Sequence, residues 1–489
     1  MTIQHPHVDW FALSPSLAML AAAGALLLVA VLVPQRARKT AAAAGAGAGF
    51  VAAFVLAIVL AAKSPDATTA IADSIFRDRW AAVAQVLIAG CGAVAVLLSW
   101  GERWRTEHVA EYYALLAAAG AGMAFFVQAS NLMTLFLGLE WFSISLYVLC
   151  AIDIDLVGSL EAGLKYLIIG AVGSATLLFG SALVYGTTGE LGFDKIGAAG
   201  HNHDSLLVLG LAMVIAGLAF KASAAPFHMW TPDAYTGAPT PVTAFMASAT
   251  KVAALVVTYR LLVTAFPGEE HLWTWAIAGI ACASLAVGNI AALAQRNVKR
   301  LLAYSSISHA GFMLIAVAAA NALGARALVY YLIPYSAMSL GAFGVVAARE
   351  RELGVPVTLD NLAGFGWERP FLGVSMWAFM LGFLGFPLTG GFVGKFYVFA
   401  AAYEHGWWWL IVVGVVATIV SAAYYLAVVR AMYFRESAEL QLAPAGGSPP
   451  RDLLLASGVG ACLVVTIGSF FAVQPLIDVA QSAANALPL

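Results

Sequence analysis

Charged residues are scarce in this chain of 489 residues, which contains 24 Lys or Arg and 26 Asp or Glu. They make up 10% of the sequence, whereas a soluble domain carries about 25%. Hydrophobic residues make up 62%, so too few polar side chains exist to cover a water-facing surface. This composition excludes a soluble enzyme and a disordered scaffold, and the net charge of −2 gives no general attraction to nucleic acid. We therefore expect an integral membrane protein.

Cysteine is also rare, and no C-x-x-C motif occurs that could begin an iron–sulfur or structural zinc site. Each cysteine stands alone in an apolar run, which is typical of a small buried side chain; they are Cys91, Cys150, Cys282 and Cys462. His201 and His203 lie in a polar loop, and their setting indicates loop polarity rather than a metal site. We expect no metal and no flavin, quinone or iron–sulfur cofactor in this chain.

Long apolar runs fill most of the sequence. A helix needs about 20 apolar residues to cross a bilayer, and about fourteen runs approach or exceed that length. The predicted spans are residues 11–33, 41–62, 80–100, 110–127, 132–151, 160–185, 206–225, 242–266, 273–293, 301–320, 327–348, 371–401, 407–434 and 453–473. Residues 206–225 run into Pro226, and residues 371–401 are too long for one straight helix. The sequence predicts an all-α membrane protein.

The basic residues between the spans predict the orientation. With the N-terminus outside, fourteen Lys or Arg fall in inside loops and five in outside loops. Cytoplasmic loops of membrane proteins carry the excess of Lys and Arg. We therefore expect both termini on the outer side.

Apart from Glu111 and Arg430 near span ends, seven charged residues fall inside predicted spans, where each costs at least ~2.5–3.5 kcal/mol and is by default a functional candidate. They are Glu140, Glu161, Lys165, Lys221, Lys251, Arg260 and Lys395. Glu140 lies near the middle of its span, and Lys165 on the following span is its nearest candidate partner. Glu161 precedes Lys165 by one helical turn, which also favours a local pair. A purely structural ion pair between helices remains an alternative reading of Glu140 and Lys165.

Two of these lysines stand beside predicted breaks in a helix. Pro226 follows Lys221 closely, and residues 382–395, which end at Lys395, contain five glycines and one proline. A broken helix is tolerated at membrane depth only where it lines protein or a water-filled cavity. Lys251 is too deep in its span to reach either surface, whereas Arg260 lies near the outer end, where we expect its side chain to reach the interface.

His309 lies in the middle of its span among serines, including Ser305, Ser306 and Ser308. Two readings are open: a proton relay at a hydrated position, or a core histidine whose hydrogen bonds are satisfied.

The two breaks also suggest an internal repeat. Predicted spans four to eight and nine to thirteen form two sets of five, each with its break in the fourth member. Because five is odd, the second set crosses in the opposite direction, which makes the repeat inverted. We expect an N-terminal three-helix segment (1–109), two five-helix repeats (110–266 and 272–434) and a C-terminal helix (453–489).

Three segments resemble the antiporter-like membrane subunits of bacterial respiratory complex I; they are residues 220–243, 300–311 and 390–397. The forms His-Met-Trp-Thr-Pro-Asp (228–233) and Gly-Phe-Val-Gly-Lys-Phe-Tyr (391–397) are similar to the subunit N type of NADH:quinone oxidoreductase. The related M type usually carries an acid where Lys395 stands. The resemblance covers about residues 110–434 and implies a multi-pass protein of the bacterial inner membrane. The implied partners are other membrane subunits of the complex and the lipid bilayer.

The resemblance implies a proton-translocating subunit driven by electron transfer from NADH to quinone in partner subunits, with no redox site of its own. It assigns Glu140 as the coupling charge, Lys165 and Lys221 as the switched pair, Lys251 and His309 as the relay, and Lys395 as the exit group. Two alternatives are a subunit of a multisubunit cation/proton antiporter and a scaffold whose buried charges only fix helix packing.

Overall fold

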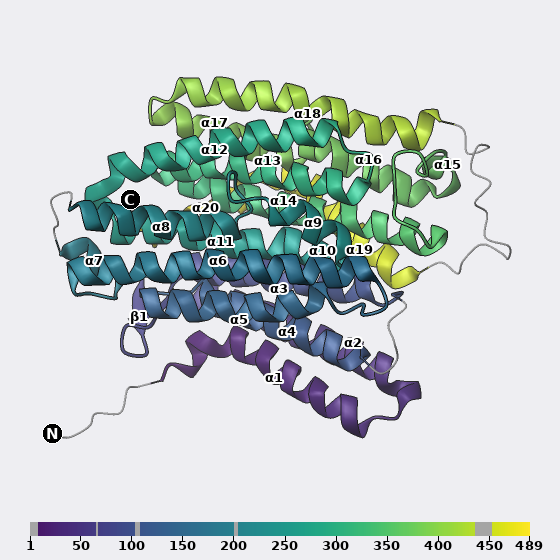
Figure 1. Ribbon diagram of the computed structural model, residues 1–489, viewed down its shortest axis with the longest axis horizontal. Coiled ribbons are helices and arrows are strands. Elements are labelled where there is room, and N and C mark those ends of the chain that lie inside the picture. The colour runs from purple at the N-terminus through teal and green to yellow at the C-terminus, as the bar shows by residue number, and fades with distance from the viewer. Residues whose placement is uncertain (1–7, 65–66, 103–107, 200–203, 436–451) are drawn as a thin grey trace.

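The computed structural model describes residues 8–64, 67–102, 108–199, 204–435 and 452–489. Within these ranges, 12 helices are long and apolar enough to cross a membrane. The helices run side by side, from the N-terminal α1 at one edge of the bundle to α18 at the other (Figure 1). The all-α membrane fold is confirmed, while the exact number of fourteen spans, the domain boundaries and the inverted repeat stay predictions.

The N-terminal part consists of helices and one antiparallel hairpin. Its elements are α1 (Trp10–Leu32), α2 (Gln35–Lys63), β1 (Thr68–Ala70), β2 (Ile75–Arg77) and α3 (Arg79–Ser99). The next elements are α4 (Val109–Phe126), α5 (Leu132–Cys150), α6 (Val157–Thr188), α7 (Phe193–Ala198), α8 (Ser205–Lys221), α9 (Trp230–Gly237), α10 (Thr240–Phe245), the π-helical η1 (Met246–Thr250) and α11 (Lys251–Ala265).

The remaining elements pack against the first half of the chain. They are η2 (Pro267–Glu269), α12 (Glu270–Leu293), α13 (Val298–Ala318), α14 (Ala322–Leu353), α15 (Phe365–Glu368), α16 (Pro370–Leu384), α17 (Gly390–Glu404), α18 (Trp408–Phe434), α19 (Leu453–Phe471) and α20 (Val473–Ala484). The last of these was not predicted, because α20 is short and alternates apolar with polar residues. Its buried face packs against α14 and α3.

Both predicted breaks are confirmed. Helix α8 ends at Lys221, and the chain turns until α9 begins, because Pro226 has no N–H to continue the helix. Helix α16 ends at Leu384, where Gly385 adopts a positive φ of 83° that favours glycine. Helix α17 then begins at Gly390, so Lys395 lies in its second turn.

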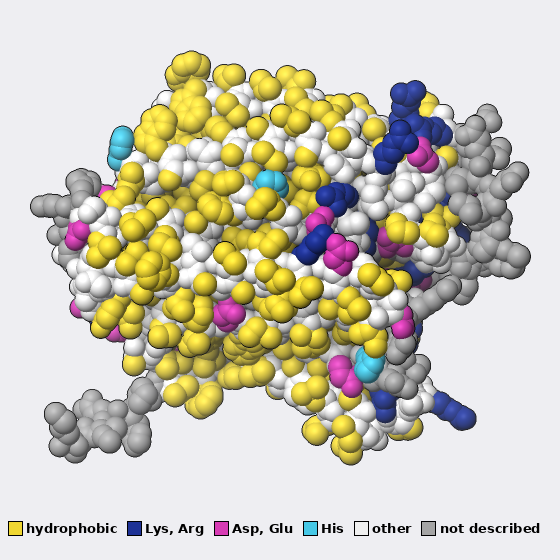
Figure 2. All heavy atoms as spheres, in the orientation of Figure 1, with side chains coloured by type: hydrophobic (Ala, Val, Ile, Leu, Met, Phe, Trp, Pro, Cys, Tyr) yellow, Lys and Arg dark blue, Asp and Glu magenta, His cyan; other side chains and the backbone are white. Residues whose placement is uncertain are grey.

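The continuous element α10–η1–α11 lies at the centre of the bundle, with its apolar window buried throughout. By contrast, the outer faces of the peripheral helices expose large apolar side chains, such as Leu167, Val172 and Phe179 on α6. Figure 2 shows hydrophobic side chains over the middle of one face, and Lys and Arg gathered toward the end where α15 lies. The start of α1 and the C-terminus lie at the opposite end (Figure 1). This distribution is that of a bundle surrounded by lipid.

Candidate functional site

Lys221 is the first centre of the site, at the C-terminal end of α8. Its side chain is buried, and its Nζ donates to Ser143 Oγ of α5 at 2.6 Å and to the Tyr166 hydroxyl of α6 at 3.1 Å. The ammonium also lies 4.5 Å from the centre of the Phe142 ring. Hydroxyls and an aromatic face, rather than a carboxylate, therefore hold this buried charge.

Glu140 lies on α5, three residues before Ser143, so the two side chains project from the same face of the helix. Its Oε1 is buried, and among the described residues it has no hydrogen-bond partner. No ion pair joins it to Lys221 in the described part of the chain, and Ser143, one turn further along α5, accepts from Lys221 instead. Glu140 thus places an unpartnered, buried carboxylate oxygen on the face of α5 that also carries Ser143.

Lys165 does not contact Glu140, so the predicted pairing of these two residues is wrong. The Lys165 Nζ lies 2.6 Å from Glu161 Oε1 and 2.9 Å from Asp233 Oδ2, and 42% of the side chain is exposed. Successive residues on a helix point about 100° apart, and because Tyr166 faces Lys221, Lys165 faces α9 instead. The local pair with Glu161 is confirmed.

Asp233 is a residue that the sequence reasoning missed. Its second oxygen lies 2.7 Å from Arg300 Nη1 of α13, so this carboxylate of α9 joins Lys165 to the other half of the chain. The available signal was an acid inside the interrupted segment, directly after the helix break. The predicted spans stopped before Asp233, which is why it was not counted among the intramembrane charges.

Lys251 is the second centre and begins α11 directly after the π-helical turn η1. Its side chain is fully buried, and its Nζ donates to the carbonyl oxygen of Ala222 at 2.9 Å. Ala222 caps the C-terminus of α8, where the last carbonyls of a helix lack an intrahelical partner. The break after Lys221 therefore supplies the acceptor for Lys251.

His309 is buried on α13 between two tyrosines. Its Nδ1 lies 2.8 Å from the Tyr331 hydroxyl and its Nε2 lies 3.0 Å from the Tyr425 hydroxyl. Tyr425 also bonds Ser305 at 2.5 Å. Both ring nitrogens are engaged with groups that can donate or accept, which suits a satisfied core residue and a relay alike.

Lys395 is the last centre and repeats the arrangement of Lys251. Its buried Nζ donates to the carbonyl oxygen of Leu384 at 3.0 Å, at the end of α16. The ammonium also lies 4.3 Å from the centre of the Phe312 ring, which follows His309 by one turn of α13. Both lysines are therefore anchored on carbonyls at the end of a broken helix.

We call Glu140, Lys221, Lys251, His309 and Lys395 the polar axis. That these five act as one path stays a prediction, and Lys165 instead joins the half-exposed Asp233 cluster.

Arg260 is not an interfacial side chain, so the prediction that it reaches the membrane surface is wrong. Its Nη2 lies 2.7 Å and 2.6 Å from the two carboxylate oxygens of Asp78, and both side chains are buried. Asp78 comes from the N-terminal part, where no resemblance pointed to a partner. His201 and His203 lie outside the described residues. Within the described ranges, no group of His, Cys, Asp and Glu side chains could hold a metal ion.

The chain is similar to proteins of one family. Residues 129–421 match the family described as NADH:quinone oxidoreductase/Mrp antiporter, TM. A relative from Azorhizobium caulinodans, named NADH-quinone oxidoreductase subunit N, is 44% identical over 440 residues, which cover 89% of this chain and 91% of the relative. A relative from Rhizobium meliloti, named NADH-quinone oxidoreductase subunit N 1, is 38% identical over 476 residues, or 96% of each chain.

Solved structures share the fold. A chain of respiratory complex I from Thermus thermophilus matches with a TM-score of 0.80 and 33% identity, over 94% of this chain and 98% of that chain. A chain of the Mrp complex from Dietzia sp. matches with a TM-score of 0.84 over 97% of both chains. At 23% identity, the second likeness concerns the fold alone.

Proposed function

Because the chain belongs to the family of NADH:quinone oxidoreductase subunit N, we propose that it translocates protons as a membrane subunit of that enzyme. It carries no redox centre, and electron transfer from NADH to quinone in partner subunits supplies the energy. Its partners are the neighbouring membrane subunits of the complex and the surrounding lipid. The lysine at position 395 favours subunit N over the M type.

One observation carries the proposal: Lys221, Lys251 and Lys395 are buried, and each is held by carbonyl or hydroxyl oxygens instead of a carboxylate. Burial disfavours the charged form of a lysine, and a nearby carboxylate favours it. A small movement of one carboxylate therefore decides whether such a lysine holds or releases its proton. A scaffold that needed only tight packing would not keep three buried ammonium groups without carboxylate partners.

The proton path follows the polar axis. Glu140 stabilises the protonated form of Lys221, and when its influence weakens, Lys221 releases its proton toward Lys251 at the same helix break. His309 and its tyrosines pass the proton to Lys395, which releases it from the second break. Each amine returns to its neutral form as the next one is charged, so the transfers balance. Moving one charge against 100 mV requires about 2.3 kcal/mol.

Lys165 lies outside this path and affects it indirectly, through the surroundings of Lys221. The half-exposed cluster of Lys165, Asp233 and Arg300 connects α9, which follows the first break, to α6 and α13. A change in this cluster moves α9 relative to α6 and thereby the surroundings of Lys221.

The membrane is the bacterial inner membrane, and both termini face the periplasm. The excess of basic residues in the predicted inside loops supports this orientation. So does the gathering of Lys and Arg at the end of the visible face opposite the start of α1 and the C-terminus (Figures 1 and 2).

The test is Glu140→Gln in the assembled complex, with Glu404→Gln of the exposed end of α17 as the matched control. We expect NADH-driven proton pumping to fall with Glu140→Gln and to stay at the parental level with Glu404→Gln. Normal pumping in both variants would refute the proposal. Sodium exchange by the chain without redox partners would instead support the cation/proton antiporter reading.

A further inference from the structure

A cavity of about 390 Å³ lies between the end of α14 and the first turns of α16 and α19. It belongs to the end of the bundle that carries α15 and lies away from the C-terminus (Figure 1), which is the inner side in the proposed orientation. Its volume falls in the range of about 300–1,000 Å³ that is usual for small-molecule sites. The polar axis and the proposed proton path do not use this cavity.

The cavity has an apolar wall that continues into the membrane. Phe371 of α16 and Leu453 of α19 line it, and both side chains are exposed. The Phe371 ring lies against α19, 3.5 Å from the position that a Cβ at Gly460 would take, so the two helices form one continuous apolar wall. Trp367, just before α16, is also exposed, and tryptophan is enriched at the depth of lipid head groups. The wall therefore faces lipid, starting at head-group depth.

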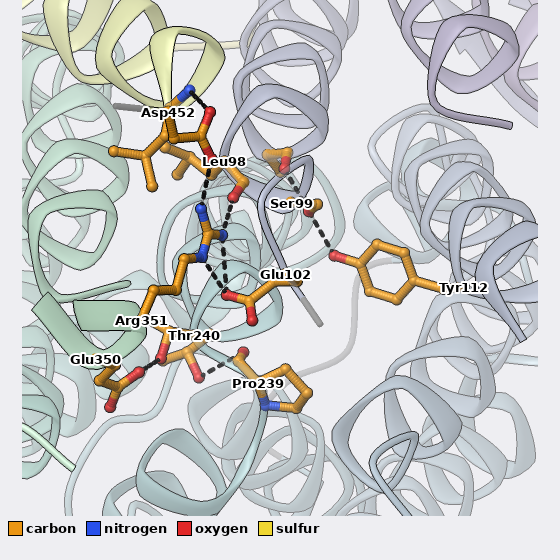
Figure 3. Close-up of polar contacts among 12 residues, drawn as sticks. Leu98, Ser99, Glu102, Tyr112, Pro239, Thr240, Glu350, Arg351 and Asp452 are labelled. Carbon is orange, nitrogen blue, oxygen red and sulfur yellow. Dashed lines mark hydrogen bonds and ion pairs between the residues drawn. The ribbon is translucent and has the colours of Figure 1, made fainter. Parts of the chain in front are cut away.

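The innermost charged group of the cavity already has its partners. Figure 3 shows Arg351 between Glu102 and Asp452, and its guanidinium nitrogens lie 2.9 Å and 2.8 Å from their oxygens. The same guanidinium donates to the carbonyl oxygen of Leu98. Arg351 thus joins α14 to α3 and α19 and closes the cavity, and a ligand must use other groups.

Arg369 and Glu368 are the groups that remain available. Arg369 donates through Nε to Glu352 Oε1 at 2.8 Å, and within the described ranges its two terminal nitrogens have no partner. Glu368 receives Arg349 Nη1 at 3.1 Å on Oε2, while its Oε1 has no partner in the same ranges. The Arg369 side chain is 24% exposed and that of Glu368 is 43% exposed, so a ligand can reach both. Two consecutive residues therefore offer free cationic donors and a free carboxylate oxygen.

The charges that line the cavity restrict the class of ligand. Two cations and three carboxylates contribute to it; they are Arg351, Arg369, Glu352, Glu368 and Asp452. This excess of carboxylates disfavours a ligand that is only anionic. The planar donors of a guanidinium match a phosphate, and a carboxylate oxygen accepts from a primary ammonium. The ligand that fits carries both groups and an apolar chain.

We propose that this cavity binds the head of a phospholipid with a primary amine, of the phosphatidylethanolamine type. The phosphate lies on the terminal nitrogens of Arg369, the ammonium lies on Glu368, and an acyl chain follows the wall formed by α16 and α19. The site goes beyond the proposed function. A lipid held there connects α16, which precedes the second break, to α19 at the inner end of the bundle.

The experiment uses phosphatidylethanolamine with a photoreactive acyl chain, added to the purified complex in phosphatidylcholine nanodiscs. Mass spectrometry of the peptides locates the crosslinks, and we expect them on residues 370–384 and 453–471. Unlabelled phosphatidylethanolamine should compete at about tenfold lower mole fraction than phosphatidylcholine or phosphatidylglycerol, because only its head donates charged hydrogen bonds to Glu368. This comparison uses the parental protein, so it does not depend on the folding of a variant.

Two variants separate the roles of the charged groups. We expect Arg369→Gln to lower the crosslink yield on these two segments about tenfold, because the phosphate loses its charged donors. Arg296→Gln is the matched control, since 84% of Arg296 is exposed and it does not line the cavity, and it should keep the parental yield. Glu368→Gln should keep the crosslinks and abolish the preference for phosphatidylethanolamine over phosphatidylcholine. Crosslinks on the exposed face of α6 should stay constant in all variants and serve as the internal reference.

Three results would overturn the inference. Equal competition by the three lipids would reduce the cavity to ordinary contact with the bilayer. Stronger competition by phosphatidylglycerol would indicate an anionic lipid and contradict the role of Glu368. A parental yield in Arg369→Gln would remove the phosphate from Arg369. None of these measurements uses NADH-driven pumping, so a failure of the proposed function would leave them unchanged.

Discussion

The buried pair of Asp78 and Arg260 gives the sharpest prediction about stability. Two oxygens of Asp78 lie 2.6 Å and 2.7 Å from one guanidinium nitrogen, and no more than 3% of either side chain is exposed. Removing one partner of a buried pair leaves the other charge uncompensated and costs about 3–5 kcal/mol. Solvent does not screen this pair, so we expect Asp78→Asn to lower the free energy of unfolding by an amount in that range.

The matched control is Asp360→Asn, because Asp360 pairs with Arg435 at 2.8 Å while 63% of its side chain is exposed. Exposed pairs contribute about 0.2–1 kcal/mol. Thermal unfolding of the purified complex and the yield of assembled complex measure both variants. The double variant Asp78→Asn/Arg260→Gln removes both charges and should recover much of the loss. Equal stability of the two single variants would refute the buried pair and favour a side chain at the membrane surface.

Two further predictions concern the second break and the N-terminus. A Cβ at Gly391 would lie 1.9 Å from the carbonyl oxygen of Gly382, so Gly391→Ala should lower complex yield, whereas Gly279→Ala, with open space around it, should not. Burial raises the pKa of Asp9, but hydrogen bonds from the Ala12 N–H and Arg77 outweigh it and hold the pKa below its usual value. At pH values above its unfolded pKa of about 4, Asp9 therefore adds about 1 kcal/mol to the free energy of unfolding. This contribution is lost as the pH falls through the lower folded pKa. An unfolding titration should therefore show Asp9→Ala less stable than the parent at neutral pH and equally stable at low pH.

The sequence alone predicted the features that depend on local chemistry. Pro226 lacks the donor that a helix needs, and Gly385 permits a positive φ, so both breaks could be located from residue type. The buried lysines could be found because a charge inside an apolar run is costly to insert and is therefore rare unless it has a function.

Pairing could not be predicted in the same way, because it depends on which faces of distant helices meet. Glu140 and Lys165 lie on consecutive helices, yet Tyr166 occupies the side of α6 that faces Lys221. Asp78 and Arg260 are separated by 182 residues, and no sequence pattern connects them. The sequence also could not predict that the carbonyls of Ala222 and Leu384 accept from the lysines. Every residue carries a carbonyl, and only the fold shows which one lacks a partner within its helix.

The most direct test of the account is the number of protons pumped per NADH oxidised by the complex carrying Lys251→Met. This change removes the ammonium and leaves a side chain of similar shape in the fully buried position. Lys195→Met is the control, because 58% of Lys195 is exposed on a loop helix. We expect a lower ratio for Lys251→Met and the parental ratio for Lys195→Met. A parental ratio in the assembled Lys251→Met complex would contradict it.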